Sequence, residues 1–127
     1  MKWYEAKPNR CIMETATIKQ VYPAAQIDIE RGYLIAFLMF QGRKGSYLLK
    51  VVYPSEFPYE EPKAFIKKPR IKDALHRWLD GSLCIKGNAE PPNLSGKIII
   101  DWSINWIKTY ENWLDGIRWP DYIRGQQ

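Results

Sequence analysis

The sequence predicts an α+β domain, with one helix before and one helix after a four-stranded antiparallel meander. Two observations support this class: apolar residues recur at helical spacing near both ends of the chain, and apolar runs separated by turn-forming residues occupy the middle. A third is the absence of repeats, low-complexity tracts and Ser/Gly-rich linkers in the 127 residues. This length suits one hydrophobic core, so a single domain over residues 1–127 is expected.

The first helix is predicted over residues 8–21. Pro8 begins the segment, where a helix tolerates proline, and Pro23 stops the pattern. The residues whose spacing suits one helical face are Ile12, Met13, Ala16, Thr17 and Val21. These positions predict a short amphipathic helix.

Four strands are predicted next. The runs that indicate them are Ile27 and Ile29 among charged residues, Tyr33 to Phe40 (YLIAFLMF), residues 47–53 (YLLKVVY) and Lys63 to Lys67 (KAFIK). Gly42 to Gly45 supplies a turn within this region, and Pro69 ends the last run. The first three runs are most simply interpreted as a meander, and the fourth, which follows the proline-rich connection, completes an antiparallel sheet.

The second helix is predicted from Asp101 onward, after a loop at residues 87–96 that is rich in turn formers. Asp101 or Ser103 is available as its amino-terminal cap, and Gly116 lies near its other end. Its apolar positions recur at three- and four-residue steps: Trp102, Trp106, Tyr110, Trp113, Leu114 and Ile117. This stripe indicates core packing, and Trp119 and Tyr122 in the tail are expected to pack as well.

Composition excludes several functional classes. The net charge of +5 permits contacts with nucleic acid, but the basic residues are dispersed, so RNA binding rests on charge and aromatic content alone. The one short basic cluster is interpreted as a solvated loop and consists of Lys67, Lys68, Arg70 and Lys72. A single histidine and two distant cysteines do not provide a zinc site, and no cofactor is expected.

The cellular setting is predicted from the same composition. The first residues lack the apolar run of a signal peptide, and no segment approaches the roughly 20 apolar residues that span a bilayer. A soluble, cytoplasmic protein is expected. Cys11 and Cys84 are then expected to be free thiols, because a reducing compartment disfavours disulfides.

Residues 76–85 (HRWLDGSLCI) contain the strongest candidate for a reactive group. Cys84 stands between Leu83 and Ile85 and follows a turn formed by residues 80–82. Two interpretations are open: a nucleophile presented at the edge of the fold, or a small buried hydrophobe, which is what free cysteines often are.

The segment upstream favours the nucleophile. Residues 53–66 (YPSEFPYEEPKAFI) carry prolines at 54, 58 and 62, and His76, Gly81, Leu83, Cys84 and Ile85 follow. Together these motifs resemble the ubiquitin-conjugating (E2) family, and the order of elements agrees over most of the chain. The resemblance implies an E2/UBC-like fold in which Cys84 accepts a protein carboxy terminus as a thioester and passes it to an amine.

The chain departs from the usual family pattern beside His76. Arg77 and Trp78 replace the Pro and Asn that normally follow this histidine, and the interval from His76 to Cys84 is two residues shorter. Because the Asn is associated with the oxyanion or with loop ordering, another donor is needed. The candidates are Asn88, Asn93, the backbone N–H groups of residues 85–87 and His76 itself.

The remaining site residues have assigned roles and alternatives. His76 is expected to brace the loop by hydrogen bonding rather than to move protons. Asp80 is the first choice for deprotonating the acceptor amine, ahead of Glu90 and Asp101, although a turn-forming role explains Asp80 equally well. Lys86 is expected to raise the thiolate fraction of Cys84 slightly.

The missing motif and the aromatic carboxy-terminal pattern look more like divergent bacterial E2-like proteins of CBASS antiphage operons. This resemblance implies a partner nucleotidyltransferase (CD-NTase) related to cyclic GMP-AMP synthase, which the E2-like protein primes. Two alternatives stay open: an E2 of a bacterial ubiquitin-like modifier pathway, and a non-catalytic E2-variant binding module. The sequence has no ATP-binding glycine loop, so a separate E1-like activating enzyme or an activated donor is required.

Overall fold

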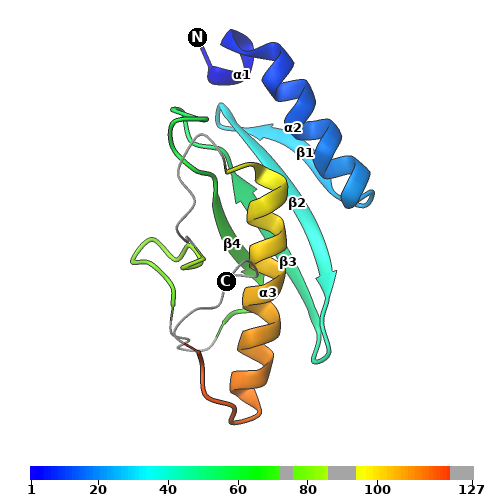
Figure 1. The fold of residues 1–127 in the computed structure, drawn as a ribbon, viewed down its shortest axis with the longest axis vertical. Coiled ribbons are helices and arrows are strands. Elements are labelled where there is room, and N and C mark those ends of the chain that lie inside the picture. Colours follow the sequence, from blue (N-terminus) through cyan, green and yellow to red (C-terminus); the bar gives the residue numbers. More distant parts are fainter. Residues whose placement is uncertain (72–75, 86–93, 121–127) are drawn as a thin grey trace.

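The computed structural model of the protein describes residues 1–71, 76–85 and 94–120 (Figure 1). The elements are α1 (Trp3–Ala6), α2 (Pro8–Val21), β1 (Gln26–Glu30), β2 (Tyr33–Gln41), β3 (Ser46–Val52), β4 (Lys63–Lys68) and α3 (Gly96–Leu114). The predicted α+β class is confirmed, as are the helix over residues 8–21 and all four strands. The short helix α1 was not predicted.

The four strands form one sheet in the order β1-β2-β3-β4, and each neighbouring pair is antiparallel. The predicted meander is therefore confirmed. Arg31 and Gly32 both have positive φ, at 54° and 85°, between β1 and β2. Positive φ at both central residues is typical of the two-residue hairpin turn whose twist matches that of the strands.

The core lies between one face of the sheet and α3, which crosses that face in Figure 1. Alternate residues of β2 and β3 point inward and are buried, including Leu34, Leu38, Leu49 and Val51. These side chains meet the buried face of α3, so the sheet and this helix form the two main layers of the domain.

The predicted aromatic stripe of α3 faces this core. Trp102, Trp106 and Tyr110 are buried, which confirms the interpretation as core packing, but Ile117 lies beyond the end of the helix and is 56% exposed. The basic cluster also differs from the prediction. It is not wholly a loop, because Lys67 and Lys68 are exposed residues at the end of β4.

Helix α2 differs from the prediction in its buried face. Ile12 and Met13, expected on one apolar face, are 63% and 64% exposed, whereas Glu14 and Ile18 are buried. The Glu14 carboxylate accepts hydrogen bonds from the Tyr53 hydroxyl (2.6 Å) and the Gly96 N–H (2.9 Å). A buried carboxylate with these partners orients the helix in a way that apolar spacing alone does not reveal.

Helix α3 begins at Gly96, so the prediction of a start at Asp101 was wrong. Its cap is Ser95, whose side chain accepts a hydrogen bond from the Ile98 N–H at 3.3 Å. Asp101 and Ser103 lie inside the helix. Gly96 follows many turn formers and therefore resembles a loop residue in the sequence. In the structure glycine serves close packing there, because a Cβ on Gly96 would lie 2.0 Å from the Tyr53 hydroxyl oxygen.

Candidate active site around Cys84

Residues 76–85 form a small hairpin that carries Cys84 at its base. Arg77 and Leu83 make an antiparallel bridge, and the Trp78 N–H donates to the Ser82 carbonyl at 2.9 Å. Gly81, at φ 88°, allows the tight turn at the tip. The Leu83 N–H donates to the Ala64 carbonyl at 2.9 Å, and this bond fixes the hairpin against β4.

Cys84 is partly exposed, while its neighbours Leu83 and Ile85 are buried at 3% and 5% exposure. These buried neighbours anchor the backbone on both sides of the thiol. Burial raises the pKa of the Cys84 thiol, which therefore stays mainly protonated at neutral pH. Both cysteines are free, as predicted. The expected influence of Lys86 falls outside the described residues.

His76 contacts Cys84 through its main chain. The His76 carbonyl accepts hydrogen bonds from the Cys84 N–H at 2.7 Å and from the Trp106 indole Nε1 at 3.1 Å. The residue has a φ of 64°, in the left-handed region that few non-glycine residues occupy. Its imidazole ring stacks on Trp119, with ring centroids 5.1 Å apart and planes inclined by 22°.

Asp80 lies at the tip of the hairpin with both carboxylate oxygens engaged. One oxygen accepts from the Ser82 N–H (2.9 Å) and hydroxyl (2.6 Å), and the other accepts from the Lys63 ammonium at 2.9 Å. The hydrogen bond from Lys63 is the main cause that holds the pKa of Asp80 well below its usual range, and the bonds from Ser82 add to it. Such a carboxylate is a weak base.

The structure thus brings Cys84, His76 and Asp80 into one hairpin. The Ile85 N–H, one of the predicted oxyanion donors, donates instead to the Leu83 carbonyl at 3.1 Å. Asp101 is engaged elsewhere, with Lys97 at 2.6 Å and with the Tyr22 hydroxyl. The other predicted participants, Lys86, Asn88, Glu90 and Asn93, lie outside the described residues, as does Tyr122 of the tail.

Two tryptophans belong to this site although the sequence placed them only in the core. Trp106 is fully buried, and Trp119 is 5% exposed and packs edge-on against Trp106 with centroids 5.1 Å apart. The expectation that Trp119 packs is confirmed. Trp119 stands six residues after Trp113, outside the three- and four-residue steps of the stripe, so helical spacing gave no signal for its role beside His76.

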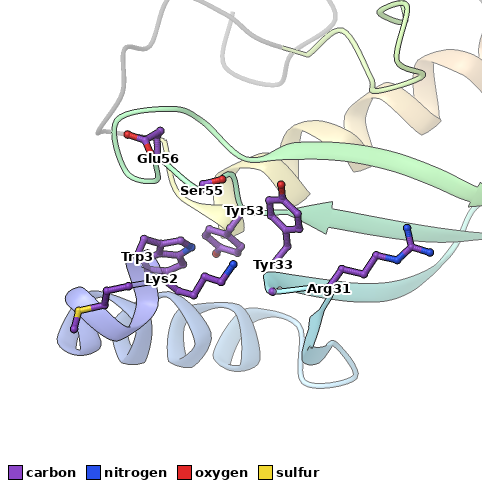
Figure 2. A pocket seen from close by; sticks show the side chains of 9 residues that line it. Lys2, Trp3, Arg31, Tyr33, Tyr53, Ser55 and Glu56 are labelled. Atoms are coloured by element: carbon purple, nitrogen blue, oxygen red, sulfur yellow. The ribbon is translucent and has the colours of Figure 1, made fainter.

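A separate cleft of about 310 Å³ lies at the amino-terminal end of the molecule. Figure 2 shows it between α1 and the β1–β2 hairpin, with Lys2 reaching toward Tyr33 and the Arg31 side chain extending away from Lys2. Its lining also includes Trp3, Tyr53, Ser55 and Glu56. None of its lining residues belongs to the Cys84 hairpin.

Two further classes of site were sought in the described parts of the chain. Within residues 1–71, 76–85 and 94–120, no group of three or more His, Cys, Asp or Glu side chains is arranged to hold a metal ion. The helices in these ranges include none that is both long and apolar enough to cross a bilayer.

Comparison with known proteins identifies the family. Neither the curated proteins nor the solved structures provide a significant match. The family model described as "Type II CBASS E2 protein" matches residues 14–124, which include both motifs that suggested the resemblance and the whole Cys84 hairpin. The chain therefore belongs to the Type II CBASS E2 proteins, the E2-like component of a CBASS antiphage system.

Proposed function

We propose that this protein is a conjugating enzyme that carries a protein carboxy terminus as a thioester on Cys84 and transfers it to an amine. The observation that carries the proposal is the placement of Cys84, together with the membership of the chain in the Type II CBASS E2 family. Cys84 is a partly exposed residue, and its backbone is held by the hydrogen bond from the Leu83 N–H to β4 and by the His76 carbonyl. A rigid backbone beneath an accessible sulfur suits a nucleophile better than a core hydrophobe.

The chemistry proceeds in two acyl transfers. The Cys84 thiol loses its proton, and the thiolate attacks the activated carbonyl carbon of the donor and expels its leaving group to form the thioester. An amine then attacks the thioester carbonyl, the C–S bond breaks and Cys84 regains a proton, so that an amide is released. Because burial raises the pKa of Cys84, we propose that deprotonation accompanies donor binding. Activation of the donor is assigned to a separate E1-like enzyme.

For the oxyanion we propose Asn88. The described backbone offers little alternative, since the Cys84 N–H donates to His76 and the Ile85 N–H donates to Leu83. His76 is proposed as the brace of the loop, through its carbonyl. Asp80 is proposed to accept a hydrogen bond from the incoming amine, because its lowered pKa makes it a poor acceptor of a whole proton.

The proposal extends to fold and partner. The order of helix, meander, proline-rich connection, cysteine segment and helix is that of the E2/UBC fold. Membership in the CBASS family favours the carboxy terminus of the partner CD-NTase as donor, with priming of that enzyme as the outcome, over a ubiquitin-like modifier. We place the reaction in the cytoplasm, where the thiol stays reduced.

The test is formation of a thiol-sensitive adduct. The purified protein is incubated with the operon's nucleotidyltransferase, ATP and activating enzyme, and then resolved by electrophoresis with and without reductant. We expect an adduct that reductant removes, that is absent in Cys84→Ala and that persists as a reductant-resistant ester in Cys84→Ser. Cys11→Ala, which removes the other free thiol, is the control and retains the adduct.

Two results would refute the proposal: no reductant-sensitive adduct with either the nucleotidyltransferase or a ubiquitin-like protein, or an adduct that survives in Cys84→Ala. Phage defence that is intact in Cys84→Ser and Cys84→Ala would instead establish the non-catalytic binding module.

A further inference from the structure

We propose that Trp106 and Trp119 are positioning residues for Cys84, which act by holding the main chain of His76 in its left-handed conformation. The inference rests on the proposed function of Cys84 and adds to it two residues that lie in and beyond α3. Neither indole is proposed to touch the reacting atoms. Their effect passes through one carbonyl group.

The first step is the conformation of His76. A φ of 64° is unfavourable for a side chain with a Cβ, so the surrounding structure must hold it. In this conformation the His76 carbonyl accepts the Cys84 N–H at 2.7 Å. If His76 relaxed to negative φ, its carbonyl would turn and the Cys84 backbone would lose this bond.

The second step is the bond from Trp106. Its indole is fully buried, and the Nε1–H donates to the same His76 carbonyl at 3.1 Å. A buried indole N–H without an acceptor is costly, so Trp106 opposes any rotation that removes this carbonyl. One oxygen thus connects the helix α3 with the backbone of the nucleophile.

The third step is the stack on Trp119. The Trp119 ring lies nearly parallel to the imidazole, at 5.1 Å, and fixes the His76 side chain. Trp119 is itself held edge-on by Trp106 at 5.1 Å and by Trp113 at 6.2 Å. The chain beyond α3 therefore closes over His76, and in Figure 1 the orange-red segment returns from the end of α3 toward the hairpin.

We call the contacts of Trp106 and Trp119 with His76 the clamp. If the clamp is released, two reactions of Cys84 should change in opposite directions. Thioester formation requires a set orientation of sulfur, and a displacement of about 1 Å can cost roughly a hundredfold in rate. Alkylation by iodoacetamide has no such requirement and speeds up when a thiol becomes more exposed and its pKa returns toward normal. A substitution that only lowers stability does not slow thioester formation and speed up alkylation together in the folded protein.

The first experiment compares His76→Gly with His76→Ala. Both remove the ring, but only glycine adopts positive φ without strain. We expect His76→Ala to form the thioester about tenfold or more slowly than His76→Gly and to be alkylated several-fold faster than it. Equal loss in both variants, with alkylation unchanged, would show that the imidazole itself is required and would overturn the proposal.

The second experiment compares Trp119→Leu with Trp3→Leu. The two tryptophans are matched: they are 5% and 6% exposed, and neither Nε1 has a hydrogen-bond partner among the described residues. We expect Trp119→Leu to lower kcat for thioester formation with little change in KM and to accelerate alkylation, whereas Trp3→Leu changes neither. Trp119→Phe, which keeps a flat ring, should restore most of the rate.

If Trp119→Leu and Trp3→Leu changed kcat and the alkylation rate equally, at matched losses of Tm, the proposed positioning role of Trp119 would be overturned. If Trp119→Leu fails to fold, the glycine and alanine variants of His76 decide the matter. If the wild-type protein forms no thioester, the proposed function fails, and the alkylation rates still test whether the clamp sets the exposure of Cys84.

Discussion

Gly96 is the position at which the structure predicts the sharpest effect of a single added methyl group. A Cβ there would lie 2.0 Å from the Tyr53 hydroxyl oxygen, 2.7 Å from Tyr53 Cζ and 3.1 Å from Ile18 Cδ1. Tyr53 cannot move aside freely, because it is 1% exposed and its hydroxyl donates to Glu14 at 2.6 Å. Gly96→Ala must therefore disturb the junction of α2, α3 and Tyr53.

The magnitude follows from three contributions. Overpacking a core costs about 1–3 kcal/mol, and the loss of a buried hydrogen bond to a carboxylate costs about 1.5–3 kcal/mol. The higher helix propensity of alanine offsets at most about 1 kcal/mol. We expect Gly96→Ala to lower the free energy of unfolding by about 1.5–5 kcal/mol.

The assay is urea unfolding followed by tryptophan fluorescence, with a common slope for all variants. Gly45→Ala is the matched control, since a Cβ on Gly45 meets nothing within 4 Å. A Gly96→Ala protein that unfolds within about 0.5 kcal/mol of both the wild type and the control would refute this account of the packing around Tyr53.

Two further predictions concern titratable groups. The buried Glu111 accepts from the Arg43 N–H (3.0 Å), the Lys44 N–H (2.8 Å) and the Tyr47 hydroxyl (2.9 Å). Glu111→Gln should lower the free energy of unfolding, measured in urea, by about 1–3 kcal/mol, because an amide N–H then faces one of these donors. An unchanged free energy of unfolding would contradict these three hydrogen bonds. Burial raises the pKa of Glu111, but these hydrogen bonds outweigh burial and hold the pKa below its ordinary value. Its contribution is therefore complete above the unfolded pKa of about 4.3 and is lost as pH falls through the lower folded pKa, so the difference from Glu111→Gln should shrink in acid. For Cys84, burial raises the pKa of the thiol, so the pH midpoint of its alkylation rate in the wild-type protein should lie above that of a free cysteine measured alongside; a midpoint at or below that of the free cysteine would contradict the burial of the thiol.

The strands could be predicted well because their signals are local. Alternating or continuous apolar runs bounded by Gly42, Gly45 and Pro69 indicate where each strand begins and ends to within two residues. Strands that follow one another in the chain are usually neighbours in a sheet, which leaves the meander as the simplest arrangement of the four strands. The motifs around Cys84 also lie close together in the chain, so their order along the sequence is enough to indicate the family.

The helix faces could not be predicted in the same way. Apolar spacing favoured Ile12 and Met13, but the buried residue of that turn is Glu14, because its partners Tyr53 and Gly96 come from distant parts of the chain. Gly96 looked like a loop residue for a related reason. Its lack of a side chain serves close packing against Tyr53, and spacing along the chain carries no information about that contact.

Residue order alone was sufficient to indicate the fold class, the strand order, the family and Cys84 as the candidate reactive group. The way in which Cys84 is held became clear only from contacts between distant segments: the His76 carbonyl at φ 64°, the indole of Trp106 and the stacked ring of Trp119. The physical reason is the distance along the chain over which each interaction acts. Periodicity and turn chemistry act between near neighbours, whereas the environment of the thiol is built from a hairpin, a helix and the segment beyond that helix, which meet only in the folded core.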